Sequence, residues 1–164
     1  MNKTRVYVET TIPSFLCENR ISPENIARKH WTWLWWDQAP RFYELVSSTA
    51  VLDELSRGKN DNASERLRVI GPLPLLPITP EIGEIVQTYI KHMVMPAEPA
   101  GDALHLALAS YYKCDFLVTW NCVHLANANK FNHIRRINTL LGLFIPLVVT
   151  PLELVGGNSD YETR

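Results

Sequence analysis

The sequence predicts an α/β protein in which a central parallel sheet of four or five strands lies between two layers of helices. Short runs rich in valine, leucine and isoleucine alternate along the chain with longer segments of helical periodicity. No Asn-Gly or Asp-Gly turn joins neighbouring strands, so the strands need helical crossovers, and crossovers of this kind make a sheet parallel. The length of 164 residues is that of one domain.

The expected elements follow one another as strand and helix from end to end. The predicted strands are Arg5–Val8, Arg41–Ser48, Leu73–Ile78, Asp115–Thr119 and Pro146–Thr150. The predicted helices are 22–38, 49–58, 62–70, 80–93, 99–114 and 129–141.

Local signals set the ends of these helices. Ser22 followed by Pro23 is a typical helix start, and Pro40 is expected to end that helix at Gln38. Gly58 stops the next helix. The segment 80–93 carries one apolar stripe at helical spacing with polar residues opposite, as in a helix that covers a sheet. The stripe consists of Ile82, Ile85, Val86, Tyr89 and Met93.

Composition indicates a soluble globular protein. Hydrophobic residues make up 46% and charged residues 20% of the chain, which is ordinary for a folded domain. We expect this domain to span residues 1–155 and a loose tail to follow at 156–164. The net charge of −1, from 16 basic and 17 acidic residues, gives no global attraction to nucleic acid, so such a partner would need a local basic patch.

Cysteine usage and hydropathy predict a cytoplasmic protein without a membrane partner. Three cysteines without a C-x-x-C spacing indicate a reducing compartment. Glu9 interrupts the first apolar run after three residues, unlike a signal peptide. The longest later run, Leu140–Val149, contains Gly142 and Pro146 and falls short of the ~18 residues that a membrane span requires.

Acidic and amide side chains gather near the carboxyl ends of the predicted strands. Glu9 follows the first strand, Asn121 follows the strand at 115–119, and Glu54 lies in the helix after the second strand. In parallel sheets of this class, ligands bind beyond the carboxyl ends of the strands, where the strand order reverses. We therefore expect these side chains to meet at one edge of the sheet.

Asp102 is the most informative acid. Apolar residues such as Leu104, Leu106 and Leu108 lie on every side of its helix, so Asp102 should be largely buried. A buried carboxylate is unfavourable unless it is paired or bound to a metal, and a hard divalent cation with oxygen ligands would meet that need. The alternative is that Asp102 caps its helix and interacts with the helix dipole.

The other acids have alternatives of their own. Glu9 could be an exposed charge at a strand end. Glu54 could be a solvated helix residue, with its neighbour Asp53 as the ligand instead, although Glu54 lies nearer to the buried side of its helix.

Two further side chains near these acids have plain structural readings. His105, one turn after Asp102, could orient that acid, or be a hydrogen-bonded core histidine. Cys122 beside Asn121 is expected to be a small buried thiol, because no histidine is placed as its base.

Four segments occur in the order and spacing of the PIN-domain nucleases: "VYVETTIPSFL", "STAVLDELSRG", "DALHLALA" and "LVTWNCVHLAN". Together they cover nearly the whole chain, from Val6 to about Leu154, and "DALHLALA" followed by "LVTWN" is the most specific part. The chain therefore resembles this family, and in particular the branch related to the toxin ribonucleases of VapBC toxin–antitoxin pairs.

The resemblance implies a three-layer α/β/α PIN-like domain that acts as a metal-dependent endoribonuclease. Carried over position by position, the catalytic site of the family falls on Glu9, Glu54, Asp102 and Asn121. Glu9, Glu54 and Asp102 would hold Mg²⁺ or Mn²⁺, and Glu9 is one methylene longer than the aspartate usual in the family. Asn121 replaces a family carboxylate by an amide, so we expect a single ion and weakened catalysis.

The activity implied is hydrolysis of RNA phosphodiesters, in which the ion lowers the pKa of a bound water and polarises the phosphoryl group. An antitoxin is implied as a partner. The amide at Asn121 motivates an alternative, a PIN-like module that binds RNA or protein with weak or no cleavage. A phosphatase or phosphotransfer domain is disfavoured, because the first strand ends in "ETT" and not in paired aspartates.

Hydroxyl and basic side chains are candidates for substrate contact. Thr10 and Thr119 could hydrogen-bond a phosphate or a ligand carboxylate. Arg135 and Arg136 point outward from the expected helix 129–141, and Arg57 belongs to a second basic group. That second group also contains Lys59, Arg66 and Arg68. The core side of the helix 129–141 is expected to be Phe131, Ile134, Ile137 and Leu141. The alternative for each group is a solvated helix face.

The segment "HWTWLWW" holds four of the five tryptophans. Helical spacing puts Trp31, Leu34 and Trp35 on one face, while Trp33 and Trp36 point elsewhere. Because one helix cannot easily bury both sides, the surplus predicts a protein contact, either a homodimer or a groove for an antitoxin helix. The alternative is a large core wrapped around this helix.

Overall fold

The computed structural model describes residues 3–58, 62–98 and 100–156. Within these residues, five parallel strands form one sheet in the order β3-β2-β1-β4-β5. The strands are β1 (Thr4–Val8), β2 (Tyr43–Ser48), β3 (Leu75–Leu76), β4 (Phe116–Val118) and β5 (Leu147–Val149). The predicted parallel α/β class is confirmed. The expected tail lies outside the described residues, apart from Gly156.

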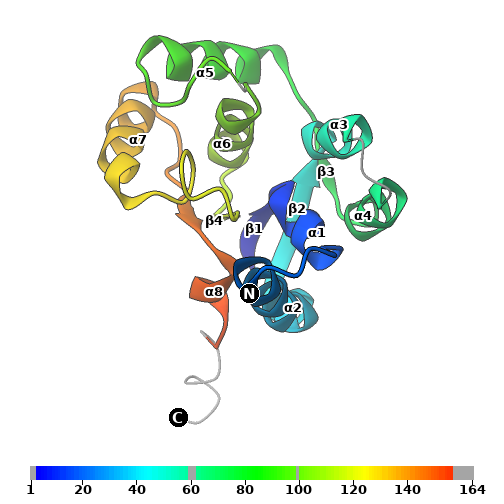
Figure 1. Cartoon of the computed structure of the whole chain (residues 1–164). Helices are drawn as coiled ribbons and strands as arrows, with labels where there is room; N and C mark the ends of the chain where they lie inside the picture. The colour runs from blue at the N-terminus through cyan, green and yellow to red at the C-terminus, as the bar shows by residue number, and fades with distance from the viewer. Residues whose placement is uncertain (1–2, 59–61, 99, 157–164) are drawn as a thin grey trace.

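Helices cover both faces of this sheet, so the architecture has three layers (Figure 1). Helices α5, α6 and α7 lie on one face, and α1, α2, α4 and α8 on the other. The helices are α1 (Thr11–Leu16), α2 (Pro23–Phe42), α3 (Thr49–Arg57), α4 (Ala63–Ile70), α5 (Pro80–Lys91), α6 (Gly101–Tyr111), α7 (Ala128–Leu141) and α8 (Pro151–Leu154).

The central strand β1 defines where a ligand can enter. Val6, Tyr7 and Val8 are fully buried between β2 and β4. The chain leaves β1 toward β2 and β3 on one side and returns to β4 on the other, so the strand order reverses between β1 and β4. There the Glu9 N–H donates to the Val118 carbonyl at 3.3 Å. The carboxyl ends of β1 and β4 therefore form the crevice at which such sheets bind ligands.

Helix α2 continues past the expected end at Gln38. Pro40 lies inside the helix, which ends at Phe42. A proline removes its own N–H from the helix, but this loss falls in the last turn, where the Tyr43 N–H still donates to the Ala39 carbonyl. Burial of Thr32, Trp35 and Ala39 on one face outweighs that local loss.

Other element bounds differ for equally local reasons. Helices α1 and α8, of six and four residues, were not predicted, because so short a segment shows no helical period. Strand β3 has two residues instead of six, because Pro74 and Pro77 flank it and cannot donate to a neighbouring strand.

The buried faces of two helices also correct the expected core. Leu141 on α7 is 40% exposed, although it was expected to face the core, and Leu34 on α2 is 44% exposed, although it was expected on the same face as the buried Trp35. Ile134 and Ile137 are buried as predicted. No helix in the described part of the chain combines the length and apolarity needed to cross a membrane.

Candidate metal centre

Glu9 lies directly beyond β1 and is buried, with 4% of its surface exposed. Its Oε2 accepts the Thr11 N–H at 3.1 Å, the Thr11 hydroxyl at 2.6 Å and the Thr119 hydroxyl at 2.5 Å. Burial raises the pKa of Glu9, although His105 and the two threonines oppose the shift. Glu9 is therefore an internal carboxylate held in place on one oxygen, and not an exposed charge at a strand end.

Glu54 lies in α3, the helix that follows β2, and its side chain reaches the same crevice. Its Oε1 lies 2.6 Å from Nε2 of the buried His105. Burial favours the neutral acid, but the hydrogen bond and the charge of His105 prevail and lower the pKa of Glu54. An ionised carboxylate only accepts hydrogen bonds, so His105 Nε2 is the donor. Asp53, the alternative ligand, points into solvent and lies 3.8 Å from Arg57.

A buried hydrogen-bond chain supports Glu54 from behind. The Nδ1 of His105 lies 2.7 Å from the Tyr7 hydroxyl, which lies 2.7 Å from the Ser48 hydroxyl. Burial opposes a charge on His105, yet Glu54, Glu9 and Asp102 together raise its pKa. This series of hydrogen bonds was not predicted from the sequence. The one signal for it was the polar side chains of Tyr7, Ser48 and His105 in apolar segments, and all three are buried. His105 contacts Glu54 rather than Asp102.

Asp102 and Asn121 form the second half of the site. Asp102, in the first turn of α6, is 8% exposed, as the expectation of burial required. Its Oδ1 accepts the Asn121 side-chain amide at 2.9 Å. The Asn121 Oδ1 accepts the His124 N–H at 3.0 Å, and this fixes the amide nitrogen toward Asp102. Burial raises the pKa of Asp102, against the charges of His124 and His105 and the Asn121 hydrogen bond.

The other oxygen of Asp102, Oδ2, is shut off from solvent and has no hydrogen-bond partner among the described residues. Ligand atoms of Glu9, Glu54 and His105 all lie within 4.8 Å of one another nearby. Glu54 raises the pKa of Asp102 by charge repulsion, so the two halves adjoin. A concentration of carboxylate oxygens with one buried oxygen unsatisfied fits a hard divalent cation such as Mg²⁺ or Mn²⁺.

Small residues leave room for this cluster. A Cβ at Gly101 would lie 2.7 Å from Oε1 of Glu54, so only glycine lets this carboxylate approach the start of α6. A cavity of about 610 Å³ opens beside the cluster, and Glu54, Asp102 and Arg57 line it. Arg57 is therefore placed at the rim of the site.

The remaining candidates lie around this cluster or away from it. Thr10 is the N-cap residue of α1, next to Glu9. Thr119 is fully buried and its hydroxyl serves Glu9 and the Asn121 N–H, so this geometry gives no support to a direct contact with substrate. Arg135 and Arg136 are exposed on α7 and line a separate surface pocket, and their predicted role stays a prediction. Cys122 is exposed, which corrects the expectation of a buried thiol.

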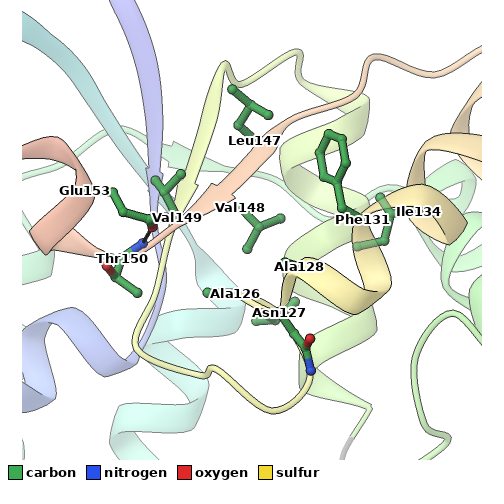
Figure 2. A pocket seen from close by; sticks show the side chains of 11 residues that line it. Ala126, Asn127, Ala128, Phe131, Ile134, Leu147, Val148, Val149, Thr150 and Glu153 are labelled. Carbon is green, nitrogen blue, oxygen red and sulfur yellow. Dashed lines mark hydrogen bonds between the residues drawn. The ribbon is translucent and has the colours of Figure 1, made fainter.

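Figure 2 shows a further pocket of about 630 Å³, between α7 and β5. Phe131, Ile134, Leu147 and Val148 give it an apolar lining. Glu153 is the one acid among its described lining residues, and it accepts the Thr150 N–H at 2.6 Å. None of these lining residues belongs to the carboxylate cluster, so the two places are separate.

The sheet order and the two helical layers define a three-layer α/β domain with a parallel sheet. A scan against protein-family models and a search of curated proteins find no match to this chain. Among solved structures, the crystal structure of VapBC2 from Rickettsia felis bound to a DNA fragment from their promoter is similar. The TM-score is 0.54 at 12% sequence identity, and the match covers 90% of this chain and 98% of that chain. Likeness at this identity shows the fold, and the predicted PIN-like fold is confirmed.

Proposed function

We propose that this protein is a metal-dependent endoribonuclease of the PIN-domain type, related to the toxin ribonucleases of toxin–antitoxin pairs. The buried Oδ2 of Asp102, which has no hydrogen-bond partner among the described residues and lies near enough to Glu54 to be affected by its charge, is the observation that carries the proposal. Three carboxylates at a sheet switch point are strongly unfavourable together unless a cation joins them. We propose that Glu9, Glu54 and Asp102 hold one Mg²⁺ or Mn²⁺.

The bound ion would supply an activated water and a polarised phosphoryl group. The residues of this chain prepare the place for it. Thr11 and Thr119 hold one oxygen of Glu9, which leaves Oε1 free of hydrogen bonds among the described side chains. His105 keeps Glu54 ionised and oriented. Arg57 at the rim of the adjoining cavity is placed to contact a phosphate of the RNA.

Partner and compartment follow from the same proposal. The similar solved structure contains VapBC2 with promoter DNA, which supports an antitoxin as a partner here. Ile26, Trp33 and Leu34 are exposed on one side of α2 and support a homodimer. The three cysteines form no disulfide, which fits an RNA-cutting enzyme in the reducing cytoplasm.

One observation favours a second candidate, a PIN-like module that binds RNA or protein with weak or no cleavage. The Asn121 amide donates to Asp102, and its carbonyl oxygen is already used by the His124 N–H. This position therefore offers the metal no charge, and one lone pair of its carbonyl oxygen is already used. Cleavage by highly purified protein separates the two candidates.

Asp102→Asn tests the proposal directly. The substitution removes one of three clustered charges but retains an oxygen for the Asn121 amide. We expect at least a ~100-fold loss of Mn²⁺-dependent RNA cleavage and a large loss of Mn²⁺ affinity by calorimetry. The metal-free variant should be as stable as the wild type or more stable, because charge repulsion in the cluster is relieved.

Asp53→Asn is the matched control. Asp53 precedes Glu54 and its side chain is 71% exposed, so its variant should bind Mn²⁺ like the wild type. An Asp102→Asn protein that is destabilised but fully active would show that Asp102 only stabilises its helix, and the metal site would then be rejected.

A further inference from the structure

A second, polar pocket adjoins the carboxylate cluster on the other side of Glu9. It has a volume of about 530 Å³ and lies between α1, the loop that follows α1, and the start of α4. Thr11 belongs to both places, because it lines this pocket while its N–H and hydroxyl donate to Glu9. Thr11 therefore connects this pocket with Glu9 of the candidate metal centre.

Arg66 from α4 brings into this pocket a positive charge that forms no ion pair with an acid among the described residues. Its Nε is shut off from solvent and has no hydrogen-bond partner in the described chain. Three and four residues away on the same helix face stand Asn62, Ala63, Val69 and Ile70, so no acid can pair with it along α4. A guanidinium remains charged at any physiological pH, and burial of its N–H groups without an acceptor is unfavourable.

Glu18 is the one acid among the described residues that line the pocket, and it is already bound to other groups. Glu18 is buried, and both of its oxygens accept from the Arg20 guanidinium, at 2.9 and 2.7 Å. It also accepts the N–H groups of Asn19 and Arg20. The charges of Glu18 and Arg20 cancel, so the charge of Arg66 remains as the excess in the pocket.

We propose that this pocket binds a phosphate of single-stranded RNA, one that flanks the bond cut at the carboxylate cluster. The inference rests on the proposed nuclease function and assigns part of its substrate path. Arg66 supplies the planar set of N–H donors that matches phosphate oxygens, and the side chain of Asn19 is a second donor in the lining. A backbone phosphate at this place would fix the register of the strand over Glu9 without reading its sequence.

Binding of a fluorescein-labelled single-stranded RNA to the full chain, measured by anisotropy with EDTA present, tests the proposal without cleavage. We expect Arg66→Gln to weaken binding about tenfold at low salt and to reduce the slope of log K against log salt by ~0.7, one phosphate contact. Arg68→Gln is the matched control, because Arg68 is exposed two residues along the same helix and lines no part of this pocket. Its affinity should stay within about twofold of the wild type.

Melting curves verify that each variant is folded. Should Arg66→Gln unfold, Arg66→Lys carries the test, with the charge kept, the planar donors lost and about a threefold loss of affinity expected. Wild-type affinity and salt slope in the folded Arg66 variant would overturn the proposal. So would an equal loss in the Arg68 variant, which would indicate a diffuse basic surface.

A separate cleavage assay with Mn²⁺ distinguishes this inference from the function on which it rests. Wild type that cleaves RNA, together with an Arg66 variant that binds RNA normally, would reject the phosphate pocket alone. Wild type that binds RNA through Arg66 but cuts none would reject the nuclease and retain the pocket. Competition by sodium phosphate, at equal strength in wild type and in Arg66→Gln, would show that a free anion binds elsewhere and would also overturn the pocket.

Discussion

At the scale of single residues, the candidate metal centre depends on the lack of a side chain at Gly101. Gly101 at the start of α6 has no Cβ, and Oε1 of Glu54 occupies the space that a Cβ would need. The same oxygen accepts from His105, so Glu54 is held between α6 and the buried Tyr7–His105 pair. Helix α6 therefore supplies both the space for the Glu54 carboxylate, at Gly101, and the donor that holds it, His105.

Gly101→Ala should impair the site without harming the fold. The new methyl group would meet only the far end of a flexible side chain, so Glu54 turns away from the cluster and loses its His105 contact. We expect Mn²⁺ affinity and RNA cleavage to fall about 10- to 100-fold, as when a supporting contact of a metal ligand is lost. Unfolding free energy should stay level or rise slightly, because alanine favours a helix over glycine.

Gly83→Ala provides the comparison for that variant. Gly83 lines the same cavity, but a Cβ there would contact nothing within 4 Å. It should gain the same small helix stabilisation and keep full metal affinity. Equal metal affinity in both glycine variants would mean that Glu54 does not bind the ion.

At the scale of elements, the connection between α1 and α2 is held by one carboxylate. Glu18 accepts from the Arg20 guanidinium and from two backbone N–H groups, and its own carbonyl accepts Lys29 Nζ at 2.7 Å. The hydrogen bonds and the charge of Arg20 lower the pKa of Glu18 to about 2. This loop also forms one wall of the proposed phosphate pocket.

Acid should release this connection in a defined pH range. The folded pKa of about 2 lies below the ordinary value of 4.5, so the stability from Glu18 is complete above pH 4.5 and is lost as the pH falls toward 2. We expect Arg20→Ala to be less stable than wild type at pH 6, and the difference to shrink steadily between pH 4.5 and 2. Urea unfolding at a series of pH values measures this difference in the free energy of unfolding.

The difference in stability between wild type and Arg20→Ala reports on Glu18. Burial raises the pKa values of Glu9 and Asp102, but these two acids titrate in both proteins, so their effect cancels. Glu18→Gln should remove the same pH-dependent difference. A constant gap between wild type and Arg20→Ala down to pH 2 would contradict the assigned role of the Arg20 contact.

At the scale of the whole molecule, α2 leaves apolar surface uncovered. Trp35 is buried and Trp31 stacks on Trp120, with ring centroids 6.1 Å apart. Trp33 is 42% exposed and Leu34 is 44% exposed, although the Trp33 indole donates to the Leu16 carbonyl at 3.1 Å. Helix α2 therefore has a buried side and an exposed apolar side, but the division differs from the expected one, because Trp36 packs against the core and Leu34 is exposed.

A homodimer through this surface should be sensitive to charge at Leu34. We expect wild type to have twice the monomer mass by light scattering, and Leu34→Glu to have the monomer mass with an unchanged melting curve, since an exposed side chain contributes little to the core. Leu140→Glu on α7 is the control, because Leu140 is even more exposed, at 77%, and lies outside α2. A wild type that is already monomeric, or a Leu34→Glu protein that stays dimeric, would contradict the dimer.

Much of the fold could be predicted because its signals are local. Alternation of apolar runs with helical periods gave a parallel sheet between helices, and Ser22-Pro23 marked the start of α2. Strand bounds at β3 and the short helices α1 and α8 could not be predicted, because prolines and a few neighbouring hydrogen bonds decide them. Pro40 was wrongly expected to stop α2, because the Tyr43 N–H donates to the Ala39 carbonyl in the last turn and Lys3, distant in sequence, donates to the Pro40 carbonyl.

By itself, the sequence determined that Glu9 follows β1 and that Asn121 follows β4. It also determined that Asp102 lies in a helix so apolar that its carboxylate must be largely buried. Only the tertiary structure decided what each of them contacts. It placed Glu54 rather than Asp53 beside Glu9, joined His105 to Glu54, and gave one oxygen of Asp102 no partner within the described part of the chain. The reason is physical: a position along the chain follows from local periodicity, whereas a contact is the joint result of several elements packed together, and no single segment encodes it.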